Sequence, residues 1–202
     1  RMDKDSGKQP EVIDEERREV SQWLWRIPVL AVAAGGAYGA IRAVVHQFVR
    51  KDANPNPEFT DRPDVHVGTL ADFPAEWDDI EFALPTETGA QLPAVAVRIP
   101  QAVPGSVEIR NAVDVVMAHI IAFSRICTHQ QCVVSMNRDL NAIKLGFNHD
   151  TNTPAITCPC HLSVFDPLQG GKAVSGAAEI PLPRVRLRYE AGAIIADGFE
   201  IT

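Results

Sequence analysis

Two short segments hold all four cysteines of the chain and two of its six histidines. The first, box 1 (residues 127–132), reads Cys127-Thr128-His129-Gln130-Gln131-Cys132, and the second, box 2 (residues 158–163), reads Cys158-Pro159-Cys160-His161-Leu162-Ser163. Each box offers two thiols and one imidazole on a segment short enough to be a turn. Four clustered cysteines are too few to staple a domain of 202 residues. The fold therefore has to bring two loops together around these six side chains.

Three chemistries use such a set of side chains. A structural zinc ion takes four ligands, but zinc ribbons and knuckles usually begin with C-x-x-C, and box 1 offers C-x-H. Two disulfides leave the paired histidines without a role. A [2Fe–2S] centre with two thiolates on one iron and two imidazoles on the other uses C-x-H with C-x-x-H. With the remaining two cysteines bonded to each other, only this third chemistry accounts for all six residues.

The two boxes resemble those of Rieske iron–sulfur proteins, and the whole chain resembles the Rieske subunit of cytochrome bc-type complexes. The resemblance implies that Cys127 and Cys158 bind the inner iron and that His129 and His161 bind the outer, solvent-facing iron. It also implies a disulfide between Cys132 and Cys160 that ties the two loops together. A disulfide needs an oxidising compartment.

Three departures from the family pattern, and one match to it, bear on the site. Ser163 matches the serine that donates a hydrogen bond to a bridging sulfide, whereas Phe165 stands where high-potential members have a tyrosine. Each such hydrogen bond raises the reduction potential, so one donor of two predicts an intermediate to high value. Gln130 and Gln131 stand where the family commonly has Leu-Gly. The 28 residues between His129 and Cys158 are more than is usual, and they predict a surface insertion over residues 137–153.

A third loop, rich in proline in the family, is expected to cover the cluster. Two segments qualify for it. The segment Gly176-Ala177-Ala178 aligns with it but has no proline, and Pro181-Leu182-Pro183 has two. The sequence leaves both open.

Residues 23–49 are predicted to form a transmembrane anchor. Fifteen uncharged residues, IPVLAVAAGGAYGAI, lie between Arg26 and Arg42. A helix of about 23 residues spans roughly 35 Å, enough for a hydrocarbon core of roughly 30 Å. Trp23 and Trp25 suit a membrane interface. A cleaved signal sequence and a buried core helix remain alternatives.

Residues 1–22 are polar and charged, and they are predicted to be a cytoplasmic tail. Within them, Arg17-Arg18 ahead of the apolar segment resembles a twin-arginine export signal. Because the cluster is assembled in the cytoplasm and the disulfide forms outside it, export of a folded head by this route reconciles the two. The expected location is a bacterial cell membrane, crossed once, with the head on the periplasmic or outer side.

Residues 50–64 contain three prolines and few apolar side chains, and they are predicted to be a flexible hinge linker. Residues 65–202 form the soluble domain, with a cluster-binding subdomain at about 124–176. Short β-like runs predict strands over residues 65–70, 81–84, 94–99, 113–123, 185–189 and 193–196, with a hairpin turn at residues 190–192. These runs predict a mainly β domain, an antiparallel sandwich or a small barrel. The family resemblance implies a Rieske-type antiparallel β sandwich with a cluster-binding subdomain, preceded by one N-terminal transmembrane helix.

The resemblance implies proton-coupled, one-electron transfer from quinol to a c-type cytochrome, next to a cytochrome b subunit. His161 and His129 are the expected catalytic residues. The chain would be the redox subunit of a quinol–cytochrome c oxidoreductase and would not be catalytic alone. Its net charge of −7 argues against a nucleic-acid partner. Two alternatives are the small Rieske subunit of arsenite oxidase and a zinc-stabilised periplasmic module.

Overall fold

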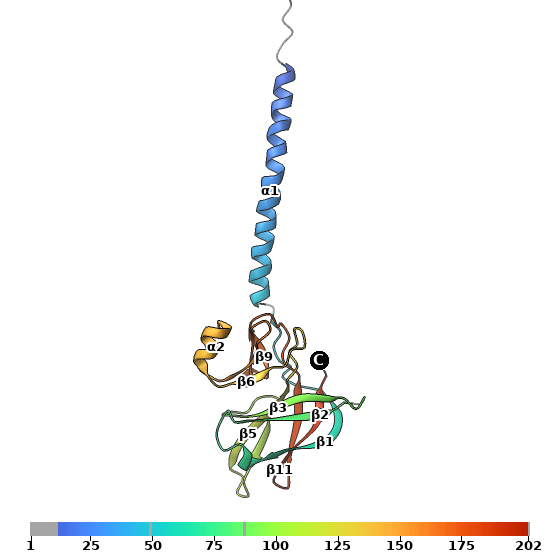
Figure 1. Cartoon of the computed structure of the whole chain (residues 1–202), viewed down its shortest axis with the longest axis vertical. Coiled ribbons are helices and arrows are strands. Elements are labelled where there is room, and N and C mark those ends of the chain that lie inside the picture. Colours follow the sequence, from blue (N-terminus) through green and yellow to red (C-terminus); the bar gives the residue numbers. More distant parts are fainter. Residues whose placement is uncertain (1–11, 49, 87, 202) are drawn as a thin grey trace, which may run out of the picture. The chain divides into compact units, whose positions relative to one another are not determined.

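The computed structural model describes residues 12–48, 50–86 and 88–201. The chain divides into two compact units, with the boundary between residues 49 and 50. Figure 1 shows both, and each is described here by itself. The first unit is a helix and the second is a β head.

The first unit contains one long helix, α1 (Val12–Phe48). Its stretch Arg26–Val44 is 19 residues long, has a mean hydropathy of 1.5 and buries none of its surface within the chain. By length and composition it is able to cross a membrane. The helix begins inside the segment predicted to be a tail. Residues 1–11 and the side chains of Arg17, Arg18, Trp23 and Trp25 lie outside the described residues, so the export signal and the aromatic belt stay predictions.

The head confirms the antiparallel β fold that the sequence predicts. A seven-stranded sheet has the order β1-β11-β10-β5-β3-β2, with β4 paired to β5, and a four-stranded sheet has the order β6-β7-β8-β9. The large sheet consists of β1 (Phe59–Thr69), β2 (Asp79–Pro85), β3 (Gln91–Ile99), β4 (Val107–Arg110), β5 (Val116–Ser124), β10 (Arg184–Glu190) and β11 (Ala193–Glu200). The small sheet consists of β6 (Ser135–Asn137), β7 (Ala155–Cys158), β8 (Ser163–Asp166) and β9 (Lys172–Ser175). Two 3₁₀ turns complete the head, η1 (Leu70–Asp72) and η2 (Pro167–Gln169).

The hairpin of β10 and β11 forms because the local sequence has the alternation of a strand and a turn with positive φ values. Side chains along β11 alternate between half-buried and buried over its whole length, as a period of two requires. Ala191 and Gly192 connect β10 to β11, with φ values of 50° and 87°. Two positive φ values in a two-residue loop give the turn twist that suits antiparallel strands. The predicted turn at residues 190–192 is therefore confirmed.

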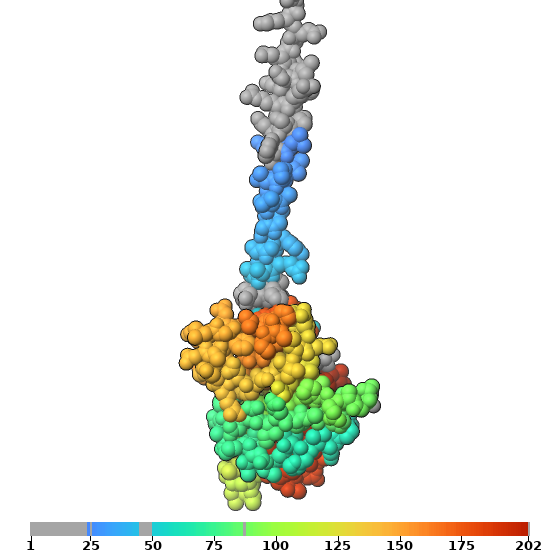
Figure 2. All heavy atoms as spheres, in the orientation of Figure 1, coloured from blue at the N-terminus to red at the C-terminus, as the bar shows by residue number. Residues whose placement is uncertain are grey.

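A helix that the sequence analysis did not predict lies in the insertion over residues 137–153. Helix α2 (Leu140–Phe147) begins after Asp139, whose carboxylate accepts hydrogen bonds from the main-chain N–H groups of Asn141 and Ala142. It ends at Asn148, which adopts a left-handed conformation. Figure 2 shows this part of the chain, in yellow to orange, covering one end of the head. The insertion is thus a capped helix packed on the small sheet.

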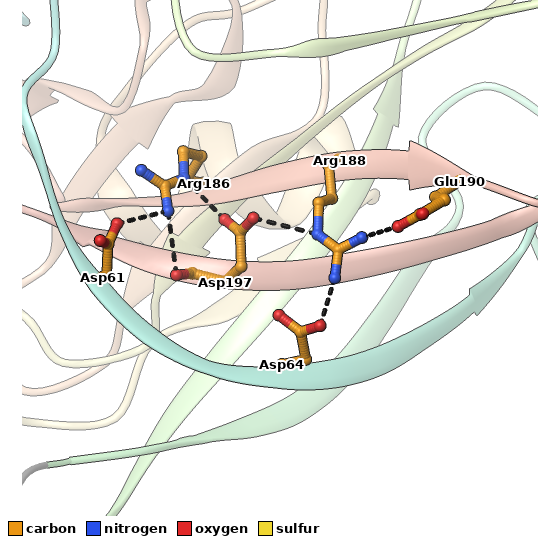
Figure 3. A network of polar contacts seen from close by, with 6 residues as sticks. All are labelled: Asp61, Asp64, Arg186, Arg188, Glu190 and Asp197. Atoms are coloured by element: carbon orange, nitrogen blue, oxygen red, sulfur yellow. Dashed lines mark hydrogen bonds and ion pairs between the residues drawn. The ribbon is translucent and has the colours of Figure 1, made fainter.

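The flexible linker predicted over residues 50–64 is wrong for its last six residues, because β1 begins at Phe59. Its Asp61 and Asp64 carboxylates bind the guanidinium groups of Arg186 and Arg188 on β10. Figure 3 shows both arginines also sharing Asp197 of β11. The composition of residues 50–64 could not reveal these ion pairs, because the arginines that bind Asp61 and Asp64 lie more than a hundred residues further along the chain. Pro63 is tolerated because it lies in a register shift between β1 and β11.

The hydrophobic core joins the two sheets beneath the boxes. One buried cluster combines side chains of the large sheet, such as Val97 and Phe123, with Ile156 and Phe165 of the small sheet. Cys127 and Cys158 belong to the same cluster. A second cluster fills the interior of the large sheet. The boxes therefore rest on packed side chains that hold their inner ends in place.

Candidate metal centre

Both boxes are reverse turns, and each leads into a strand of the small sheet. Box 1 follows β5 and is closed by a bridge between Ile126 and Val133. Within it, the N–H of Cys127 donates to the carbonyl of Cys132 at 2.8 Å, and the N–H of Gln131 donates back to the carbonyl of Cys127 at 2.9 Å. Box 2 is the turn of the β7–β8 hairpin, in which Cys158 pairs with Ser163. Two rigid turns thus present the candidate ligands.

The disulfide implied by the family resemblance is present. Cys132 and Cys160 are bonded across the two boxes, with their Cα atoms 6.6 Å apart. Cys127 and Cys158 remain free thiols and are 2% and 1% exposed. The sulfur of Cys158 lies within 4.8 Å of both disulfide sulfurs. The fold therefore divides the four cysteines into a disulfide, Cys132–Cys160, and a pair of buried free thiols, Cys127 and Cys158, which are able to bind metal.

The two histidines lie together on the surface of the head. The rings of His129 and His161 have their centroids 4.7 Å apart and meet edge to face at 88°. Both residues are exposed, in contrast with the two buried thiols. The six box side chains thus include two sulfur donors inside and two nitrogen donors outside, as the sequence analysis expects for an inner and an outer iron.

The free thiols lie in a desolvated environment. Burial raises the pKa of the Cys127 thiol, and the neighbouring Cys158 thiol adds to this effect. The main-chain N–H groups of His129 and Gln130 act in the opposite direction, because they donate hydrogen bonds to the Cys127 sulfur. Such donors stabilise a thiolate. The turn that contains His129 thus partly offsets the effect of burial on the pKa of Cys127.

These residues fit a [2Fe–2S] cluster with mixed ligands. Cys127 and Cys158 supply two thiolates from the core side, and His129 and His161 supply two imidazoles from the solvent side. The disulfide removes the other two cysteines from the set of ligands. Two thiolates on one side and two imidazoles on the other are the ligand set of a [2Fe–2S] centre with mixed ligands.

Ser163 and Phe165 both lie in β8, next to the candidate ligands. The Ser163 hydroxyl is fully buried and accepts a hydrogen bond from the N–H of Ala178 at 3.0 Å. Its own hydrogen is left to donate elsewhere. Phe165 is buried in the core cluster that contains Cys127 and Cys158. These positions are compatible with the roles that the resemblance implies for them, and those roles remain predictions.

The third loop of the site consists of residues 176–180. Gly176 has φ +78°, and a Cβ there would lie 2.3 Å from the carbonyl oxygen of Leu162 in box 2. The hydroxyl of Thr128 in box 1 donates to the carbonyl of Ile180 at 2.6 Å. The other segment considered above instead has Leu182 buried in the core. The loop across both boxes is therefore the one that lacks proline.

Several residues of this region were not singled out by the sequence analysis. Thr128 ties box 1 to the third loop, and no local signal distinguishes it from any other threonine. Val133, Leu162 and Ile180 expose large apolar side chains next to box 1, in box 2 and in the third loop, respectively. A surface of this kind suits contact with an apolar ligand or partner.

The match to a family decides what this site is. Residues 99–186 match the Rieske [2Fe-2S] domain. The chain contains a Rieske domain. It therefore binds a [2Fe–2S] cluster and belongs to the iron–sulfur proteins of electron transport. Both boxes and the third loop lie inside the matched range.

The chain is also similar to curated relatives. The chain is 40% identical over 78 residues to the "Cytochrome bc1 complex Rieske iron-sulfur subunit" of Corynebacterium efficiens, which is 38% of this chain and 16% of that protein. It is 30% identical over 86 residues to the "Putative respiratory nitrate reductase subunit Rieske" of Haloferax mediterranei, which is 42% of this chain and 33% of that protein. The chain thus spans a third or less of the length of these two relatives.

Among solved structures, the plasma membrane Rieske protein of Synechocystis PCC 6803 is 25% identical, with a TM-score of 0.40. That likeness covers 65% of this chain and 97% of the Synechocystis protein.

Proposed function

We propose that this Rieske protein transfers one electron, coupled to a proton, from quinol to a c-type cytochrome as the iron–sulfur subunit of a cytochrome bc-type respiratory complex. The observation that carries the proposal is the pair of exposed imidazoles, His129 and His161, above two buried thiols. The relative from Corynebacterium efficiens, a subunit of a cytochrome bc1 complex, supports the same assignment.

In this proposal Cys127 and Cys158 hold the inner iron, and His129 and His161 hold the outer iron. When bound, the cluster supplies a one-electron couple. Each imidazole that binds through one nitrogen keeps an N–H on the other. Because both rings are exposed, that nitrogen is accessible to the hydroxyl of a quinol. It would lose its proton more readily in the oxidised state, take one from the quinol hydroxyl as the electron arrives, and release it again when the electron leaves. Of the two, His161 lies next to the exposed Leu162, on the apolar side of the site.

The rim residues of the site suit a quinol-binding partner. Val133, Leu162 and Ile180 present apolar surface at the two boxes and the third loop, which matches the character of a quinol and of the membrane protein that would bind it. We assign a cytochrome b subunit as the partner on this face. A c-type cytochrome would accept the electron at the same exposed histidines.

We also propose that the chain spans a bacterial cell membrane once, through Arg26–Val44, with its head on the periplasmic or outer side. The Cys132–Cys160 disulfide supports this side, because cytosolic thiols are kept reduced. Export of the folded head through the twin-arginine route, directed by Arg17-Arg18, would let the cluster be inserted first.

A second candidate is the Rieske subunit of a nitrate reductase, which the Haloferax mediterranei relative favours. Deletion of the gene followed by assays on isolated membranes separates the two. Our proposal predicts the loss of quinol-dependent reduction of cytochrome c, with restoration by the full chain and no restoration by the His161→Ala variant. Loss of quinol-dependent nitrate reduction, with cytochrome c reduction intact, would overturn it. A cytochrome b should also purify with the tagged chain in mild detergent.

A further inference from the structure

The segment that leads into the head is attached to the third loop of the cluster site. The Arg50 guanidinium donates hydrogen bonds to the carbonyls of Val174 at 3.1 Å and of Gly176 at 2.8 Å. Next to it, the N–H of Lys51 donates to the carbonyl of Glu179 at 2.9 Å. We call residues 50–54 the strap. Three hydrogen bonds thus connect the strap to the end of β9 and to the loop over residues 176–180.

The far end of the strap is fixed to the interior of the head. Asp52 forms an ion pair with Lys172 of β9. The carbonyl of Asn54 accepts a hydrogen bond at 2.7 Å from the guanidinium of Arg184, which is 1% exposed and paired with the buried Glu200. A buried arginine with all these partners is a rigid anchor. The strap therefore connects Arg184 in the core to the third loop of the site.

The loop that the strap reaches contacts both boxes. Gly176 packs directly on the main chain of Leu162, and Ile180 accepts the hydrogen bond from Thr128. Between them, the N–H of Ala178 donates to the Ser163 hydroxyl. The orientation of that hydroxyl therefore depends on where the loop lies. A shift of the loop would release the Ser163 oxygen from its donor.

We infer that Arg50 is a positioning residue for the cluster, acting through the loop over residues 176–180 and the Ser163 hydroxyl. The inference rests on the proposed function and on the hydrogen bond to the cluster that the family resemblance implies for Ser163. The forked guanidinium holds the carbonyls of Val174 and Gly176 together, which an ammonium group cannot do in the same geometry. Arg50, the first residue of the head, thus helps to set the reduction potential of the cluster.

The first test measures the loop itself by amide hydrogen exchange in the full chain with its cluster. Arg50→Met should speed exchange in the peptide covering residues 176–180 by about tenfold or more, because charge-assisted hydrogen bonds are lost. Arg50→Lys should give a smaller increase. Arg98→Met is the matched control, since Arg98 also donates to main-chain carbonyls, those of Phe73, Pro74 and Met117, away from the boxes. Equal exchange in Arg50→Met and Arg98→Met would overturn the inference.

The second test is a double-mutant cycle on the midpoint potential with Arg50→Met and Ser163→Ala. If Arg50 acts through Ser163, each single variant lowers the potential, and the double variant falls no further than Ser163→Ala alone. Additive shifts would overturn the route through Ser163. No shift in Ser163→Ala would instead contradict the hydrogen bond that the family resemblance implies for Ser163. A changed midpoint potential in Ser163→Ala with an unchanged potential in Arg50→Met would contradict the inference about Arg50 and leave the proposed function intact.

Discussion

Each box contains one residue in a backbone conformation that L-amino acids disfavour. Gln131 in box 1 has φ 59°, and Leu162 in box 2 has φ 54°. Gln131 occupies the position where the Rieske pattern commonly has glycine, so the structure explains that preference: the turn between Cys127 and Cys132 needs a left-handed residue there. In this chain Gln131 adopts the left-handed conformation in that turn, although a side chain makes this conformation less favourable than it is for glycine.

Gln131→Gly should therefore stabilise the head. Removing the side chain from a left-handed position should increase the free energy of unfolding by about 0.5–1 kcal/mol. The measurement is the thermal midpoint of the cluster-loaded protein. Gln130→Gly is the matched control, because Gln130 is equally exposed and does not have positive φ, and it should lower the midpoint. A lower midpoint for Gln131→Gly would show that the side chain makes a contact worth more than the strain.

A hydroxyl group at position 165 should raise the reduction potential. Phe165 is fully buried in the core cluster that contains Cys127 and Cys158, so a tyrosine there places its O–H near the cysteine sulfurs. A hydrogen bond to a cysteine sulfur stabilises the more negative, reduced cluster. Potentiometric titration of Phe165→Tyr tests this expectation. An unchanged potential in a variant of unchanged spectrum would exclude a hydrogen bond from this position.

At the scale of the elements, the sequence predicted strands of the large sheet, but it predicted neither the strands of the small sheet nor the helix in the insertion between the boxes. Runs such as residues 94–99 and 193–196 show the composition and spacing of strands, and they lie in β3 and β11. Helix α2 is short, and its apolar face is one buried residue, Ile143. An eight-residue helix gives too little periodicity to recognise. Asp139 before it and Asn148 after it were the available signals.

Helix α2 should depend on Ile143 for its attachment to the small sheet. Ile143 is fully buried against Ala155 and Val164, so Ile143→Ala should reduce the free energy of unfolding by about 2–4 kcal/mol. Leu145→Ala is the matched control on the same helix, because Leu145 is 85% exposed and should change stability little. Thermal unfolding of both variants makes the comparison. Equal effects would mean that α2 is not held by this contact.

The Cys132–Cys160 disulfide should stabilise the arrangement of the two boxes without being needed to form it. It closes a loop with a sequence separation of 28, which is worth about 3.5 kcal/mol in the chain-entropy description. Replacing both cysteines by serine avoids leaving an unpaired thiol. We expect the variant to assemble its cluster and to lose it at a lower temperature, as followed by visible absorbance. Wild-type thermal resistance would contradict the stabilising role.

At the scale of the whole molecule, the sequence predicted an anchor, a tether and a head, and the tether is where it was least accurate. Prolines and few apolar residues over residues 50–64 look like a free linker. In the structure, this segment holds the strap and the beginning of β1, attached through Arg184, Arg186 and Arg188. Ion pairs between segments so distant in sequence leave no local pattern. The ligand assignment, in contrast, rests on the residue types and spacing of the two boxes and on the family resemblance, and it stays a prediction.

The central claim is that Cys127, Cys158, His129 and His161 hold a high-potential [2Fe–2S] cluster. The most direct measurement is EPR spectroscopy of the anaerobically prepared full chain, reduced first with ascorbate and then with dithionite. We predict a rhombic signal of a mixed-ligand [2Fe–2S] cluster already after ascorbate. The His161→Ala variant should lose this signal. A signal that requires dithionite would contradict the high potential and quinol oxidation, and an iron-free protein that contains zinc would contradict the cluster itself.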